Sequence, residues 1–219
     1  MKSKKYVYLG ISGAAIAVAV IIIITQFAVP PPPVQNTQQP GQVAFLDFSY
    51  DEENSDLRST LATYHINMTK PIRLSSDADV RQYCNFLTDP TKQALVTYCT
   101  STELKDNQGF LGDITMLGSQ DVPGIVVVAL QSNPMLSNYD DVKTVFGVTL
   151  NSTICSCWEN NSTSGYTSLN SLLDKLRDDH LSTKDPTTST PTLALGNKHF
   201  KIELTTNENG YLWKLLVAK

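Results

Sequence analysis

The chain opens with a long run of apolar positions. Residues 6–29 contain no charged side chain, and about 20 apolar residues are enough to span the hydrocarbon core of a bilayer. The run is longer than the core of a cleaved secretory signal, and Gln26 stands where a cut after Ala28 requires a small residue. We therefore predict a retained transmembrane helix over residues 6–29.

The polar positions around this run predict its orientation. Lys2, Lys4 and Lys5 precede it, and the next basic residue is Arg58, so the positive-inside rule places residues 1–5 in the cytoplasm as a basic tail. Residues 30–42 are rich in Pro and Gln and predict an extended linker. Residues 43–219 then form one extracytoplasmic globular domain, and the expected location is the cell membrane, crossed once.

Small residues spaced by four lie within the apolar run. Such spacing lets a second transmembrane helix approach closely, which is one route to a homo-oligomer. The alternative is that Gly and Ala are simply frequent in membrane-spanning helices. The residues concerned are Gly10, Ala14, Gly13 and Ala17.

In the first part of the outer domain, the spacing of apolar residues changes from that of a strand to that of a helix and back. Residues 43–50 place apolar side chains at every second position and predict a strand. After an acidic turn, Leu57, Leu61 and Tyr64 have helical spacing, and residues 66–74 read as a second strand. This order predicts a parallel, right-handed strand–helix–strand unit.

The middle of the domain predicts two short helices and two strands. One helix carries Val80, Cys84 and Leu87, and a second, starting at Pro90, carries Ala94, Leu95, Tyr98 and Cys99. Strands are expected at 110–117 and 122–130. The continuous apolar run in 125–130 is typical of a central strand buried on both faces.

The last part predicts helices and a terminal hairpin. A helix should run from Asn138 or Asp140 to Phe146, followed by extended chain over 148–158. Five positions define the clearest amphipathic helix: Leu169, Leu172, Leu173, Leu176 and His180.

Asn209-Gly210 is the pair favoured in a two-residue type I′ turn, which would place Leu204 opposite Leu215. The same register sets Ile202 against Val217 and Thr206 against Trp213. Helices and strands mix without strict alternation, so the predicted fold class is α+β, with α/β as the alternative.

Charge narrows the range of partners. The chain has 17 Lys and Arg against 21 Asp and Glu, and removing the three leading lysines leaves 14 against 21 for the outer domain. Nucleic acid is not expected as a partner, because binding a polyanion requires basic patches. The expected partners are the bilayer and an envelope or membrane protein.

Four cysteines lie in the domain assigned to an oxidising compartment: Cys84, Cys99, Cys155 and Cys157. We expect disulfides. The favoured arrangement is a clamp, in which Cys155 and Cys157, on an extended strand, each reach across to the helical hairpin. The alternative pairs Cys84 with Cys99 and leaves the other two bridged to each other or reduced.

Cys155-Ser156-Cys157 also suggests a second chemistry. Two thiolates at this spacing can chelate copper or exchange disulfides. No second Cys-x-x-Cys, adjacent His or Met cluster accompanies them, so no cofactor is predicted.

Other candidate sites are weaker. Four acidic residues can gather calcium, but they lack the spacing of an EF-hand and also suit the start of a helix, so no metal site is predicted. They are Asp47, Asp51, Glu53 and Asp56. No Gly-x-Ser-x-Gly elbow is present, and no catalytic residue is assigned.

Asn-x-Ser/Thr sequons mark glycosylation candidates at Asn67, Asn151, Asn160 and Asn161. Asn151 and one of Asn160 or Asn161 are favoured, because they lie in polar chain, whereas Asn67 falls in a predicted strand.

Three function classes follow. The first is a membrane-anchored, non-catalytic module that binds or scaffolds another envelope or membrane-complex protein. The second is a tethered thiol-redox or metal-handling protein using Cys155 and Cys157. The third is a filament subunit: Lys4-Lys5 before the apolar run resembles the signal of archaeal pilins and flagellins in its lysines, with Tyr6 where those signals have Gly or Ala.

Overall fold

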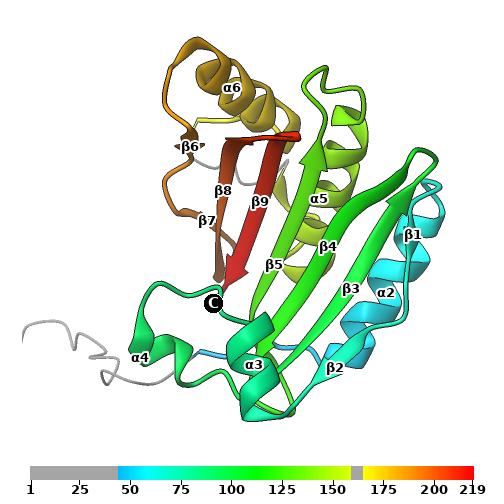
Figure 1. Ribbon diagram of the computed structural model, residues 1–219, viewed down its shortest axis with the longest axis vertical. Helices are drawn as coiled ribbons and strands as arrows, with labels where there is room; N and C mark the ends of the chain where they lie inside the picture. The colour runs from blue at the N-terminus through cyan, green and yellow to red at the C-terminus, as the bar shows by residue number, and fades with distance from the viewer. Residues whose placement is uncertain (1–43, 159–164) are drawn as a thin grey trace, which may run out of the picture. The chain divides into compact units, whose positions relative to one another are not determined.

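A large antiparallel sheet organises the domain in the computed structural model, which describes residues 44–158 and 165–219 (Figure 1). The described residues form nine strands in the order β1-β3-β4-β5-β9-β8-β6, with β2 paired to β3 and β7 paired to β8. Every pairing is antiparallel, so the α+β prediction is confirmed and the predicted parallel unit is wrong. The strands are β1 (Asn67–Met68), β2 (Ile72–Leu74), β3 (Tyr98–Asp106), β4 (Gly109–Gly118), β5 (Pro123–Ser132), β6 (Thr187–Ser189), β7 (Leu193–Leu195), β8 (Lys198–Asn207) and β9 (Gly210–Ala218).

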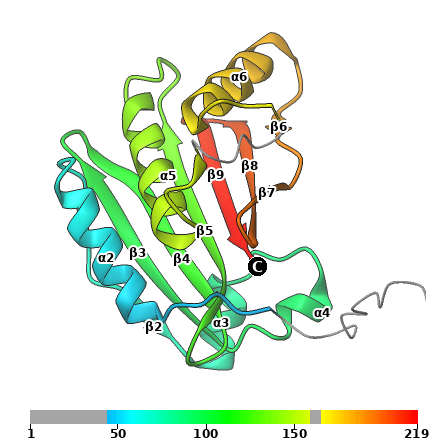
Figure 2. The ribbon, with the colours of Figure 1, turned by 180° about the vertical axis from the view of Figure 1, so that it is seen from behind.

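Helices cover the two faces of the sheet unequally. Three long helices, α2 (Tyr50–Ala62), α5 (Tyr139–Thr153) and α6 (Leu169–Ser182), pack on one face (Figure 2). The short helix α3 (Asp77–Tyr83) packs on the other face, and α4 (Pro90–Gln93) follows it (Figure 1). We call these the helical face and the α3 face.

The alternation of β9 shows how the sequence creates the two faces. Trp213, Leu215 and Val217 are fully buried toward the long helices, whereas Leu212 and Leu216, at alternate positions, are only partly buried. β5 pairs with β4 and β9 and carries Val126, Val127 and Val128 at zero exposure. The predicted central strand over 125–130 is therefore confirmed.

The terminal hairpin is present with a different register. Ile202 pairs with Leu215 and Leu204 with Trp213, two residues away from the predicted pairing. Asn207 and Gly210 form the pair of the ladder next to the turn, so Gly210 lies in strand β9 and not in the turn as predicted. Its φ is 122°. A shift of two residues keeps every side chain on its predicted face.

Residues 43–50 do not form the predicted strand. Ser49 caps α2, its Oγ accepting from the Glu52 amide at 3.3 Å, and acidic residues fill the first turn. These start signals, together with the favourable helix dipole, prevail over the alternating pattern. Leu46 and Tyr50 are nevertheless buried in the core.

Two further predicted elements are wrong. Residues 98–99 begin β3 instead of ending a helix, because Thr100 and Thr102 continue a strand alternation that four apolar positions at helical spacing concealed. Residues 148–153 continue α5, where Val148 and Leu150 pack into the helical-face core, so Cys155 and Cys157 follow a helix and do not lie on a strand.

Both edges of the sheet are built in the same interrupted way. On one edge the Thr69 amide donates to the Glu103 carbonyl at 2.9 Å, and the Thr69 hydroxyl accepts from the Glu103 amide at 3.1 Å. On the other, Thr190 makes the same two bonds with Ile202, at 2.9 and 3.0 Å. At each edge a threonine side chain replaces a backbone carbonyl, and the strand breaks there.

No helix within the described ranges is long and apolar enough to cross a membrane. The predicted basic tail, transmembrane helix and linker, residues 1–42, lie outside those ranges, as do Gly10, Ala14, Gly13 and Ala17. These assignments stay predictions.

Candidate functional site

A cleft lined mainly by charged and polar residues lies between α2 and the edge formed by β1 and β2. Its volume is about 530 Å³. The side of α2 contributes Asp51, Asn54, Ser55 and Arg58, and the edge contributes Lys70, Pro71 and Arg73. We call this the α2 cleft.

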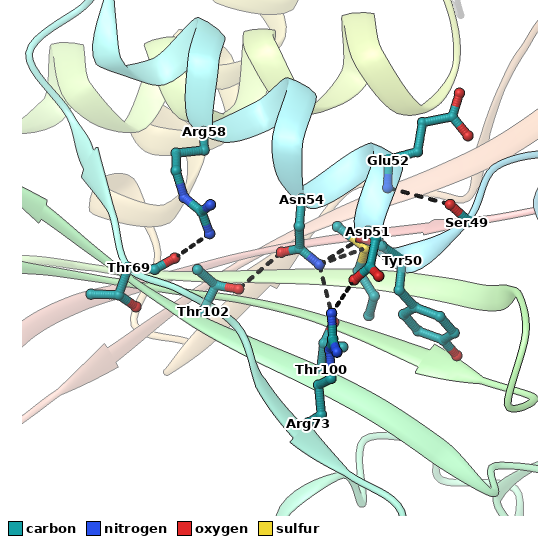
Figure 3. A network of polar contacts seen from close by, with 11 residues as sticks. Ser49, Tyr50, Asp51, Glu52, Asn54, Arg58, Thr69, Arg73, Thr100 and Thr102 are labelled. Carbon is teal, nitrogen blue, oxygen red and sulfur yellow. Dashed lines mark hydrogen bonds and ion pairs between the residues drawn. The ribbon is translucent and has the colours of Figure 1, made fainter.

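Asn54 anchors α2 beside the cleft. It is 3% exposed, its amide nitrogen donates to the Tyr50 carbonyl at 2.8 Å, and its amide oxygen accepts from the Thr102 hydroxyl at 3.0 Å (Figure 3). A further contact of 3.4 Å joins the same nitrogen to the Thr100 hydroxyl. Because a buried amide must have its donors and acceptor engaged, this network fixes α2 at one position over β3.

The two arginines of the cleft are held differently. Arg58 donates from Nη2 to the Thr69 carbonyl at 2.8 Å (Figure 3). It also donates from Nε to the Met68 carbonyl at 3.2 Å, and the two bonds fix the guanidinium where β1 ends. Arg73 pairs with Asp51 at 2.6 Å, with side chains 57% and 71% exposed. An ion pair this exposed contributes little free energy, so Arg73 can exchange Asp51 for another carboxylate.

The charge of the α2 cleft opposes that of its domain. Its lining has three cationic side chains and one acidic side chain, whereas residues 43–219 together carry 14 basic and 21 acidic residues. Arginine forks match carboxylate and phosphate oxygens. The cleft therefore suits an anionic group on a binding partner.

His180 borders a second cleft, of about 350 Å³, but its ring is already engaged. Its Nδ1 lies 2.9 Å from the Thr188 hydroxyl and its Nε2 lies 2.8 Å from the Thr206 hydroxyl. Burial lowers the pKa of His180. The histidine joins α6 to β6 and β8 and, as predicted, lies on the buried face of its helix.

The four acidic residues considered as calcium ligands do not share one site, and a buried lysine pairs with one of them, Asp47. Lys198 is 4% exposed, and its Nζ donates to the Thr153 carbonyl at 2.6 Å and pairs with Asp47 at 2.5 Å. The hydrogen bond from Lys198 lowers the pKa of Asp47, while burial raises the pKa of Glu53. With Asp51 paired to Arg73 instead, the acidic residues do not converge, and the described residues hold no group of three or more metal-ligating side chains.

The cysteines pair as Cys84–Cys99 and Cys155–Cys157, with Cα atoms 6.5 and 5.1 Å apart. Disulfide bonding is confirmed and the favoured clamp is wrong. The sheet itself prevents a clamp, because Cys84 and Cys99 pack in the cluster on the α3 face whereas Cys155 and Cys157 pack against the helical-face core.

The sequons fall in different settings. Asn67 is exposed in β1, and Asn151 is exposed in the last turn of α5 instead of in irregular chain. Asn160 and Asn161 lie outside the described residues. Glycosylation at all four stays a prediction.

Sequence reasoning missed the polar residues that fix the cleft. Asn54 was part of an acidic turn in the prediction, and its position four residues after Tyr50 on a helix was the available signal. Arg58 and Lys198 bind backbone carbonyls from distant segments, and such pairings leave no local pattern in the sequence.

Comparisons with family models, with curated proteins and with solved structures found no match for this chain.

Proposed function

We propose that this chain is a membrane-anchored module whose outer domain binds another membrane or cell-envelope protein without catalysing a reaction. The observation that carries the proposal is the cationic α2 cleft on an acidic domain. The apolar run at 6–29 and the Pro- and Gln-rich segment at 30–42 support a membrane tether for this domain.

The cleft combines a fixed part and an exchangeable part. The Asn54 network and the carbonyl bonds of Arg58 organise the site before a partner arrives, which lowers the entropy cost of binding. Arg73 then trades an exposed intramolecular pair for an intermolecular one. An acidic segment of the partner fits this combination best.

Site-specific crosslinking in native membranes tests the proposal. A photoreactive residue at Lys70 should give a discrete adduct, and Arg73→Glu should weaken that adduct about tenfold, because charge reversal repels an acidic segment. Arg81→Glu is the matched control, since Arg81 is also an exposed arginine paired with an aspartate, on α3. Equal adducts in both variants, or none at Lys70, would contradict the proposal.

N-terminal sequencing of the mature chain separates the tethered module from the filament alternative. The tethered module predicts Met1 or Lys2 at the mature end. A filament subunit predicts loss of the first five residues. Finding that loss would contradict the tethered module and support the filament subunit.

A further inference from the structure

The two disulfides of this domain differ in their surroundings. Cys84 and Cys99 are both at zero exposure within the cluster on the α3 face. Cys155 and Cys157 are partly exposed and flank Ser156, which is exposed. A thiolate from solution therefore has a path to the second disulfide that it lacks to the first.

The disulfides also differ in what folding does for them. Cys84 and Cys99 are separated by 15 residues, so the fold brings together sulfurs that are far apart in the unfolded chain. Cys155 and Cys157 are separated by 2 residues and are neighbours in any conformation. By linkage, a fold stabilises a disulfide only as much as the disulfide stabilises the fold, so folding protects Cys155–Cys157 from reduction far less.

The chain on both sides of Cys155–Cys157 is held by other contacts. Before it, the Thr153 carbonyl accepts from Lys198 and the Ile154 amide donates to the Leu150 carbonyl at 2.9 Å. After it, the Trp158 ring packs 5.6 Å from the Phe200 ring. Opening this disulfide therefore leaves the anchors of its loop in place, as a reversible redox step requires.

We propose that Cys155–Cys157 is an exchangeable disulfide that oxidises a dithiol on another protein in a stoichiometric step, one dithiol per chain and without turnover. One substrate thiolate attacks one sulfur, the Cys155–Cys157 bond breaks, and the departing sulfur takes a proton from water. The second substrate thiol, as its thiolate, then attacks the mixed disulfide and releases the other cysteine, which is protonated in turn. The substrate loses two electrons to form a disulfide, and Cys155 and Cys157 gain them as two thiols.

Reduction of the full-length chain in detergent tests the first requirement, with Cys84–Cys99 as an internal control. During a dithiothreitol titration, alkylation and peptide mass should show Cys155–Cys157 opening at about 20-fold lower reductant than Cys84–Cys99. Near-ultraviolet circular dichroism should stay unchanged over that first step. Opening of both disulfides together, or only with unfolding, would overturn the proposal.

A dithiol transfer assay tests the activity and does not depend on the proposed binding function. A synthetic peptide with two reduced cysteines should be oxidised by the chain, one peptide per chain without added oxidant. Cys155→Ser/Cys157→Ser should abolish the transfer, while Ser156→Ala should retain it. Peptide oxidation that persists in the double variant, or is absent in the unaltered chain, would overturn the proposal.

Discussion

The two faces of the sheet reach stability by different means. The helical face has a core of 30 buried side chains, which packs between the sheet and α2, α5 and α6. Cys155 and Cys157 pack against this core but are only partly buried. The α3 face buries a cluster of five, and two of those five are the bonded Cys84 and Cys99. Where apolar area is scarce, a covalent bond takes the place of packing, as is typical of small secreted domains.

The largest expected difference between the faces lies between two neighbouring leucines of β9. Leu215→Ala on the helical face should destabilise the domain by about 2–5 kcal/mol, because Leu215 is fully buried and its loss leaves a cavity. Leu216→Ala, on the α3 face, should cost about 1 kcal/mol or less. Chemical denaturation of both variants measures the difference, and equal costs would contradict the division into a packed and an open face.

Loss of the Cys84–Cys99 bond should come next in size. Cys84→Ala/Cys99→Ala should lower the free energy of unfolding by about 3 kcal/mol, because the bond closes a 15-residue loop. Hydrogen exchange should speed up first in α3, with the helical face protected until global unfolding. Cys155→Ala/Cys157→Ala is the control, for which a much smaller loss is expected since the bond spans 2 residues.

Glu53 tests how the helical face tolerates a buried charge, because this glutamate is only 3% exposed. Burial raises its pKa in the folded chain, so folding favours the protonated form and stability declines as pH rises through that pKa. Glu53→Gln removes the charge and should stabilise the domain at pH 7 by about 1 kcal/mol. The gain should vanish at a pH below the ordinary pKa of glutamate; a gain that does not depend on pH would point to another cause.

His180 should give the smallest effect. Burial lowers its pKa, so the neutral ring is favoured in the folded chain, and this contribution is present above pH 6.5 and lost as pH falls toward the folded pKa. Thermal unfolding at pH 7.5 and 5.5 should show a loss of a few tenths to about 1 kcal/mol. His180→Gln should remove this part of the pH dependence, and an unchanged profile would exclude the histidine as its source.

Elements governed by local pattern were predictable from the sequence, and elements governed by distant partners were not. Leu172, Leu173 and Leu176 identified α6, and the apolar run at 125–130 identified the centre of the sheet. β3 was not predicted. Its alternation of buried and partly buried side chains favours a strand only when β4 pairs with it and the α3 segment packs against it.

The candidate sites follow the same division. Disulfide bonding followed from the cysteines and their expected compartment, whereas the pairing depended on which face of the sheet each cysteine occupies. The α2 cleft could not be predicted from the sequence, since Arg58 on α2 and Arg73 on β2 line one cleft only after α2 packs across β3.

The threonine-interrupted edges restrict how this domain can meet other chains. Each edge offers strand segments of two or three residues, β1 and β2 on one side and β6 and β7 on the other, followed closely by Pro71 or Pro191. An incoming strand of five or six residues cannot extend such a ladder, so sheet growth into fibres stops at both margins. Copies crowded together should not join through the edges of their sheets.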